Sequence, residues 1–228
     1  MAQNQAVVSS SDSATSAPIT LSATGASRTL IYAVWLTAGA PTTLVDSAGG
    51  TLAGGQWVSV GAAGPWYIYH RLNAPAGITS VTASFAAAGY LTYCCERDDL
   101  VSFDKLGAIT DSGGSVSSWA SGSTGTLSFA NEVCFGFAAT FSGAAQGPSA
   151  TGSWSAGTGT GITSGAWATG GGLQAFVETQ TVSATTALQA TGAWSVASYT
   201  YAIAVTYRQQ TGGGGGAGSR NRLLLGVG

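Results

Sequence analysis

Residues 28–36, with the sequence RTLIYAVWL, decide the fold class of this chain. Side chains alternate between the two faces of an extended strand. Both sets are apolar here: Leu30, Tyr32, Val34 and Leu36 on one face, and Ile31, Ala33 and Trp35 on the other. A strand that is apolar on both faces is covered on both faces, so this segment is expected to lie at the centre of a β-structure.

Other segments repeat this pattern along the chain. Strong strand patterns lie at residues 65–72 (PWYIYHRL), 78–85 (ITSVTASF), 89–97 (GYLTYCCER), 131–141 (NEVCFGFAATF) and 199–208 (YTYAIAVTYR). Weaker ones lie at residues 17–21, 41–46, 56–60, 115–119, 173–181 and 185–194. Residues 73–77 (NAPAG) contain turn-forming Pro and Gly, so a hairpin is predicted between the strands on either side.

The composition favours β-structure throughout. Glycine accounts for 35 of the 228 residues, and strong helix formers such as Lys, Glu and Met are scarce. Many short strands separated by Gly and Ser turns are typical of an antiparallel β-sandwich, and we expect a jelly-roll-like one with flexible terminal arms. The expected organisation is an N-terminal arm over residues 1–16, one sandwich domain over 17–211, and a linker with a docking tail over 212–228.

Charged residues are rare in this sequence. Only sixteen residues are Lys, Arg, Asp or Glu, which is 7% of the chain against about 25% in ordinary soluble domains. A weakly ionic surface is suited to contact with other protein, so we expect a component of an assembly. The net charge of −2 and the absence of a basic cluster before the C-terminus argue against direct nucleic-acid binding.

The ends of the sequence bear on location and contacts. The first residues lack a positive segment followed by an apolar one, and no apolar run is long enough to span a bilayer, so we expect a chain made in the cytoplasm that does not enter a membrane. Residues 212–216 are five glycines, which form a flexible linker. We expect the tip beyond them to dock on a neighbour through Arg220, Arg222, Leu223, Leu224 and Leu225.

Few side chains suggest catalysis. His70 lies in a strand without a nucleophile or metal motif around it, and we interpret it as a buried or edge histidine packed between tyrosines. Cys94 and Cys95 are adjacent in a strand and point to opposite faces, so small buried thiols are expected rather than a disulfide. We therefore predict no enzyme activity, no catalytic residues and no cofactor.

Two further groups leave alternatives open. Residues 96–105 hold six of the sixteen charges, and we interpret them as a solvated loop with internal ion pairs, with a metal site as the alternative. Trp119, Trp154 and Trp167 lie in Gly- and Ser-rich surroundings and are the candidates for stacking on a sugar. The other tryptophans lie in strand-like runs, where core packing is the simpler interpretation.

Three segments together resemble a known class of protein. Residues 44–52 (LVDSAGGTL), 67–96 (YIYHRLNAPAGITSVTASFAAAGYLTYCCE) and 202–208 (AIAVTYR) resemble β-sandwich proteins of tailed bacteriophages and prophages. The resemblance covers residues 28–105, with weaker support near 200–208. Those proteins often show E-Y-S-G after the fourth strand where this chain has Glu96, Arg97, Asp98 and Asp99, so no role of that turn is carried over.

The resemblance implies a virion structural protein without an active site. Combined with the weak charge and the tethered tail, it favours a capsid decoration or cement protein that contacts the major capsid protein, other virion proteins and copies of itself. One alternative is a tail, neck or fibre component that binds host-surface glycan through aromatic loops. Another is a bacterial surface adhesin domain.

Overall fold

The structure is a computed structural model that describes residues 3–11, 14–36, 39–63, 65–86, 89–141, 148–150, 165–168 and 173–210. These residues form fifteen strands and no helix, and every strand pairing is antiparallel. The all-β class and the sandwich packing are therefore confirmed, whereas the jelly-roll connectivity stays a prediction. Nothing helical in the described ranges is long and apolar enough to traverse a bilayer.

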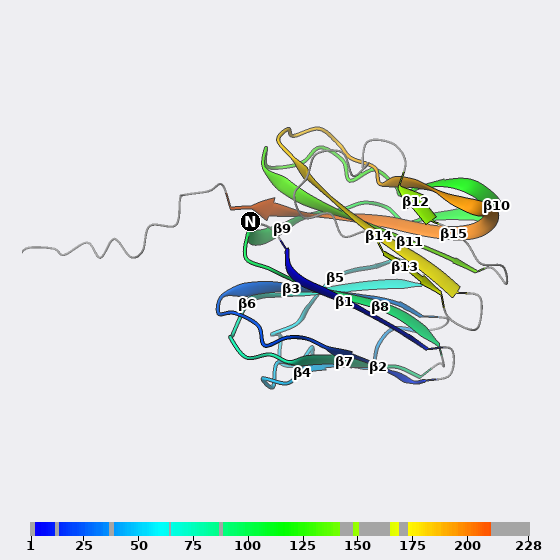
Figure 1. Cartoon of the computed structure of the whole chain (residues 1–228). Helices are drawn as coiled ribbons and strands as arrows, with labels where there is room; N and C mark the ends of the chain where they lie inside the picture. The colour runs from blue at the N-terminus through cyan, green and yellow to red at the C-terminus, as the bar shows by residue number, and fades with distance from the viewer. Residues whose placement is uncertain are drawn as a thin grey trace, which may run out of the picture.

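The strands form three sheets that stack as layers (Figure 1). Sheet A, in the middle, has the order β1 (Gln3–Ser11), β8 (Tyr90–Arg97), β3 (Arg28–Leu36), β6 (Trp66–Ala74), β5 (Val58–Ala63). Sheet B has the order β2 (Ser16–Thr20), β7 (Ser80–Ser84), β4 (Thr43–Asp46). Sheet C has the order β10 (Thr110–Ala120), β15 (Thr191–Gln209), β11 (Glu132–Phe141), β14 (Leu173–Val182), β13 (Gly165–Ala168), with β9 (Leu100–Leu106) and β12 (Pro148–Ala150) also paired to β15.

Strand β3 lies at the centre of the molecule, as its sequence predicts. All of its residues after Arg28 are buried. Ile31, Ala33 and Trp35 belong to the core between sheets A and C, and the alternate residues Leu30, Tyr32, Val34 and Leu36 belong to the core between sheets A and B. The middle sheet thus supplies one wall to each of two apolar cores.

The chain builds these layers in order. Sheets A and B use only residues 3–97, and sheet C uses only residues 100–209. Residues 3–11 differ from the expected arm, because they form β1, which pairs with β8 over eight register positions from Gln3 to Ser11. Polar residues such as those of β1 are compatible with an edge strand, which faces solvent along one side.

The predicted hairpin over residues 65–85 is wrong. Strand β6 pairs with β3 and β5 in sheet A, whereas β7 pairs with β2 and β4 in sheet B. A strand has only two edges, and both edges of β6 are occupied over most of its length. The turn between the two strands therefore carries the chain from one sheet to the other, and Thr24 fixes it by accepting hydrogen bonds from Gly77 and Ile78.

Strands β10 and β15 pair along their length and fold back together. Thr110 pairs with Ala202 at one end of β10, and Ala120 pairs with Thr191 at the other. A straight strand of this length would separate its ends by about 33 Å, yet the Thr110 hydroxyl donates a hydrogen bond to the Ala120 carbonyl oxygen. The register is irregular between Asp111 and Ser115 and again between Val116 and Ser118, and Gly113 in the first irregularity has a positive φ of 62°, which suits glycine.

The second half of this ribbon covers the outer face of sheet C. We call residues 116–120 and 191–194 the folded-back ribbon. Its Trp119 and Trp194 pack with Phe176, Cys134 and small residues of sheet C to form a third core. Two patterns expected as separate strands, 185–194 and 199–208, thus meet in one long bent strand that begins at residue 191.

The cysteines lie as expected. Cys95 belongs to the core between sheets A and C, and its neighbour Cys94 belongs to the core between sheets A and B. Cys134 lies in the third core. All three are buried free thiols, and burial raises the pKa of each one.

Candidate functional site

One end of the sandwich carries two cavities that share Asn73, and it is the candidate site. The loop beside them, residues 47–57, is anchored by Asp46 at the end of β4. The Asp46 Oδ1 accepts hydrogen bonds from the backbone N–H groups of Ala48 (2.9 Å) and Gly50 (3.1 Å). Its Oδ2 accepts from Trp57 Nε1 (2.8 Å) and from the Arg71 guanidinium. Asp46, the first residue of the D-S-A-G turn, therefore anchors this loop through a buried ion pair with Arg71.

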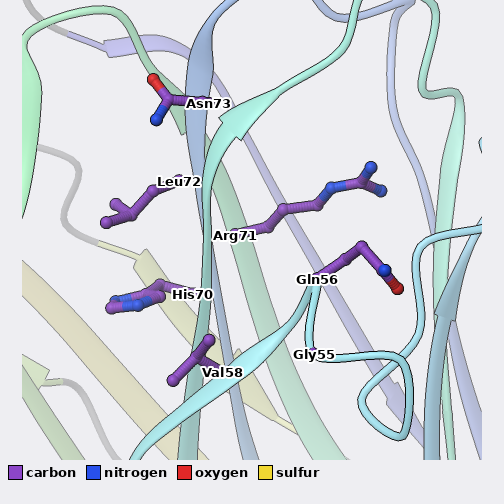
Figure 2. Close-up of a pocket in the computed structure, with 7 residues that line it drawn as sticks. All are labelled: Gly55, Gln56, Val58, His70, Arg71, Leu72 and Asn73. Atoms are coloured by element: carbon purple, nitrogen blue, oxygen red, sulfur yellow. The ribbon is translucent and has the colours of Figure 1, made fainter.

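The first cavity, which we call the His70 hollow, lies beside β6 at the beginning of β5 (Figure 2). It has a volume of about 310 Å³ and is lined by Gly55, Gln56, Val58, His70, Arg71, Leu72 and Asn73. Pairing between β5 and β6 reaches only Val58 and His70, so the edge of β6 is open beyond them. His70 and Leu72 point to one side of β6 and Arg71 to the other.

His70 is a packing residue, as its isolation in the sequence suggests. It is 7% exposed, and its ring packs in a cluster with the rings of Tyr207 and Phe103, which also contact each other. Its Nδ1 lies 3.3 Å from the Tyr207 hydroxyl oxygen. Burial lowers the pKa of His70, so the ring is neutral under ordinary conditions.

The second cavity, the Arg208 pocket, lies between sheets A and C at the same end. It has a volume of about 480 Å³ and is lined by Ser27, Asn73, Asp98, Leu100, Val101, Arg208 and Gln210. These residues come from the turn before β3, the end of β6, the connection from β8 to β9, β9 itself and the end of β15. The pocket therefore exists only when the two halves of the chain are packed together.

A buried ion pair adjoins the residues that line the Arg208 pocket, because Asp99 stands between the lining residues Asp98 and Leu100 in the sequence. Arg97 Nε and Nη2 donate to the two Asp99 carboxylate oxygens at 2.8 and 2.7 Å. The same carboxylate accepts from Gln209 Nε2 at 2.8 Å, and the Asp99 carbonyl accepts from the backbone N–H of Gln210 at 2.7 Å. These bonds tie the crossing between sheets A and C to the end of β15.

A second ion-pair group forms one wall. Arg28 lies 3.0 Å from Asp98 and 3.6 Å from Glu96. Glu96 also accepts hydrogen bonds from the Gly25 N–H and from Gln5 Nε2. The interpretation of residues 96–105 as a solvated loop is wrong, because the chain crosses between two packed sheets at this point and Glu96, Arg97 and Asp99 are buried. The internal ion pairs expected there are present, as Arg97 with Asp99 and Lys105 with Asp104.

Arg208 itself is exposed and has a different partner. Its guanidinium carbon lies 4.7 Å from the centre of the Phe129 ring, at cation–π distance. The other four described cations, Arg28, Arg71, Arg97 and Lys105, each have a carboxylate within 4.0 Å. Within the described ranges, Arg208 has no such carboxylate.

The backbone is unusual at this pocket. Ser27 (φ 57°) and Asn73 (φ 52°) are the only described non-glycine residues with positive φ, and both line the Arg208 pocket. Residues other than glycine rarely adopt a backbone conformation with positive φ, although Asn tolerates it better than most. Such strain gathers at functional sites, where the surrounding structure enforces it.

Two buried acids lie away from this end, on the outer face of sheet C. Glu178 is fully buried, and burial raises its pKa to about 8, although the backbone of Thr191 lies close enough to favour the charged form. Neither carboxyl oxygen of Glu178 has a partner at ordinary hydrogen-bonding geometry. Glu132 is also buried, and burial raises its pKa while the pKa of neighbouring Asp104 is lowered.

The sequence-predicted site residues do not gather in one place. Trp119 is 6% exposed and packs against Phe176 and Trp194, over a Gly192 that leaves room for its ring. Trp154 and the tail residues Arg220, Arg222, Leu223, Leu224 and Leu225 lie outside the described residues, as does the side chain of Trp167. No three His, Cys, Asp or Glu side chains of the described ranges group as metal ligands would.

Sequence reasoning missed the residues that line the Arg208 pocket. The one signal for Asn73 was its place at the start of the NAPAG turn, since Asn is common in left-handed turn positions. Comparisons with known proteins found no matching family model, no matching curated protein and no matching solved structure.

Proposed function

We propose that this protein is a structural component of a tailed-phage virion, and that it decorates or cements the capsid shell. The supporting observation is how little charge the surface carries. Seven of the charged residues that the structure describes are buried: Asp46, Arg71, Glu96, Arg97, Asp99, Glu132 and Glu178. Of the charged residues that the structure describes, only Asp111 and Arg208 are exposed.

Burial of these charges makes the surface less ionic than the composition alone suggests. A surface of Gly, Ala, Ser and Thr loses little hydration when another protein covers it, whereas a charged surface must be desolvated at considerable cost. The protein would then add contact area across the joints between capsid subunits and stabilise the shell by mass action. Made in the host cytoplasm, it would end in the virion.

The proposed clamp on the shell is the C-terminal tail, residues 217–228, which follows the run of five glycines. The N-terminal segment is not proposed as a second clamp, because its residues 3–11 form β1 of sheet A. A tail on a glycine linker searches a volume around its anchor, which raises its effective concentration at a neighbouring groove.

Deletion of residues 212–228 tests the clamp. We expect the truncated protein to fold normally and to be incorporated into particles at lower occupancy, measured by quantitative gel analysis of purified particles. A variant with Leu223, Leu224 and Leu225 changed to Ser keeps the length and separates apolar docking from simple tethering. Full occupancy of both variants would remove the clamp, and labelled particles seen by electron microscopy without signal on the capsid would remove the location.

A second function is favoured by a specific observation. A tail, neck or fibre component that binds host-surface glycan needs a concave polar site, and the Arg208 pocket is one. Such a protein would bind sugar as a purified chain, whereas a cement protein would not. A glycan array discriminates the two, and labelled particles seen by electron microscopy show whether the chain lies on the shell or the tail.

A further inference from the structure

We propose that the Arg208 pocket binds a sugar that carries a carboxylate, of the uronic or sialic acid type. The inference rests on the second candidate function, glycan binding in this pocket, and names the class of sugar. Three features carry it: a cation without a carboxylate partner among the described residues, neutral hydrogen-bonding groups in the same lining, and a buried ion pair that ties one lining residue, Gln210, to the crossing between sheets A and C.

The cation is the first feature. The guanidinium of Arg208 presents several N–H donors in a plane, which matches the two oxygens of a carboxylate. Its position over the Phe129 ring restricts the side chain, so less rotamer freedom is lost on binding. Because every other described cation is already paired, Arg208 is the described group best placed to recruit an anion.

The neutral groups are the second feature. Ser27, Asn73 and Gln210 line the same pocket and supply a hydroxyl and two amides, which donate to and accept from sugar hydroxyls. Leu100 and Val101 add an apolar patch, and Val101 is 46% exposed. This combination suits the C–H face of a sugar ring better than it suits a bare inorganic ion.

Asp98 restricts the charge of the ligand. It lines the pocket, and its carboxylate is paired with Arg28 at 3.0 Å, which offsets its repulsion of a single carboxylate. A polyanion would place further negative charge beside it without further cations to compensate. The pocket therefore favours a monoanion with hydroxyl groups, and the Asp98 oxygens remain available as acceptors for those hydroxyls.

The Arg97–Asp99 ion pair is the third feature. Asp99 accepts hydrogen bonds from Gln209 and from the backbone N–H of Gln210, which lines the pocket, so the end of β15 is tied to the crossing between sheets A and C. The left-handed backbones of Ser27 and Asn73 belong to the same lining. The volume of about 480 Å³ lies within the range of small-molecule sites. A site that is built before binding avoids the cost of ordering it.

Saturation-transfer NMR and calorimetry on the full chain test the proposal. The probes are N-acetylneuraminic acid and glucuronic acid, with glucose and acetate as controls for the ring alone and the carboxylate alone. We expect measurable binding of the acidic sugars and much weaker binding of either control. Absence of binding by both acidic sugars, or binding by acetate as tight as by the sugars, would overturn the proposal.

Substitutions test whether the acidic sugars bind in the Arg208 pocket. We expect Arg208→Gln to weaken the acidic sugars by about tenfold to a hundredfold, the usual effect of losing a charge-assisted hydrogen bond. Arg208→Lys keeps the charge, loses the planar donors and should give an intermediate affinity. Asn73→Gly keeps the left-handed backbone and removes the amide, so it should weaken binding without unfolding the protein. Lys105→Gln, which lies on β9 outside the lining, is the matched control.

Equal affinity of the Arg208→Gln and wild-type proteins would show that the sugar binds elsewhere and would overturn the assignment. Preference for a peptide with a free C-terminal carboxylate over both acidic sugars would overturn the sugar class. Neither result touches particle incorporation, so failure here and failure of the decoration proposal are separate outcomes.

Discussion

The two halves of the chain bury charge in opposite ways. In residues 3–97, each buried charge has an oppositely charged partner, such as Asp46 with Arg71 or Glu96 with Arg28. In sheet C, Glu178 and Glu132 are buried without a cation within 4 Å among the described residues. The difference teaches that one composition supports two kinds of polar interior: ion pairs that join elements, and unpaired acids whose pKa is raised by burial.

Loss of the Asp46–Arg71 ion pair is expected to have the largest effect on stability. We expect Asp46→Asn to lower the free energy of unfolding by roughly 3–5 kcal/mol, because it leaves the buried Arg71 without a counter-charge and replaces an acceptor of several hydrogen bonds. Urea denaturation measures the change. Asp111→Asn, at an exposed position, is the control, and an equal loss in both variants would end the contrast.

Replacing the buried, unpaired Glu178 should raise the stability of the protein at high pH, whereas replacing Asp46 lowers it. Its pKa is raised from 4.5 to about 8 in the folded protein, so the unfolded chain releases this proton at lower pH than the folded one. Its contribution to stability is therefore full below pH 4.5, falls as the pH rises to about 8 and is constant above that. We expect Glu178→Gln to remove this slope and to be more stable than wild type by a few kcal/mol above the folded pKa.

The measurement is the difference in unfolding free energy between variant and wild type across this pH range. The difference is needed because His70, whose pKa is lowered by burial, makes stability fall as the pH drops below 6.5 in both proteins. Asp111→Asn controls for loss of a carboxylate, since the lowered pKa of Asp111 affects stability only in more acidic solution. A Glu178→Gln variant with an unchanged slope would show that Glu178 is solvated.

Gly136 of β11 lies close to Ala190 and Glu178, and filling this space should have a smaller effect on stability. A Cβ at Gly136 would lie 2.5 Å from the Ala190 Cβ and 3.0 Å from Glu178 Cγ. We expect Gly136→Ala to cost roughly 1–3 kcal/mol by overpacking, measured by urea denaturation. Ala190→Gly in the same chain should restore part of the loss, whereas Gly114→Ala meets nothing within 4 Å and should be neutral. Equal stability of the two Gly→Ala variants would contradict this packing.

Thiol labelling compares the halves without changing stability. We expect Cys134, beneath the folded-back ribbon, to react through local opening of that layer, and Cys94 and Cys95 to react only through global unfolding. Mass spectrometry of the labelled protein at low urea concentrations gives the three rates. Equal rates for all three thiols would mean that sheet C and the inner cores open together.

Strand positions were readable from the sequence where local pattern decides them. Strands β3, β8 and β11 lie within one residue of their predicted bounds, because their two apolar faces leave no other solution. Pairing was less readable. The NAPAG turn has the composition of a hairpin, and only the occupation of β6 by β3 and β5 shows that it connects two sheets.

The candidate site was less readable still. The Arg208 pocket joins Ser27 to Gln210 across almost the whole described chain, so no local window contains it. Trp119 illustrates the converse error, since its Gly- and Ser-rich surroundings suggested exposure. Gly192 is instead the gap into which its ring packs, a contact between segments far apart in the sequence.

The division of the sheets at residues 97–100 also sets an order of events on the ribosome. All partners of sheets A and B have emerged once β8 is made, long before β11 and β15 exist. Until then the flank of the nascent sandwich that carries Ile31 and Trp35 has nothing to cover it. Synthesis therefore passes through a stage at which an incomplete chain exposes an apolar sheet face and is prone to associate with other incomplete chains.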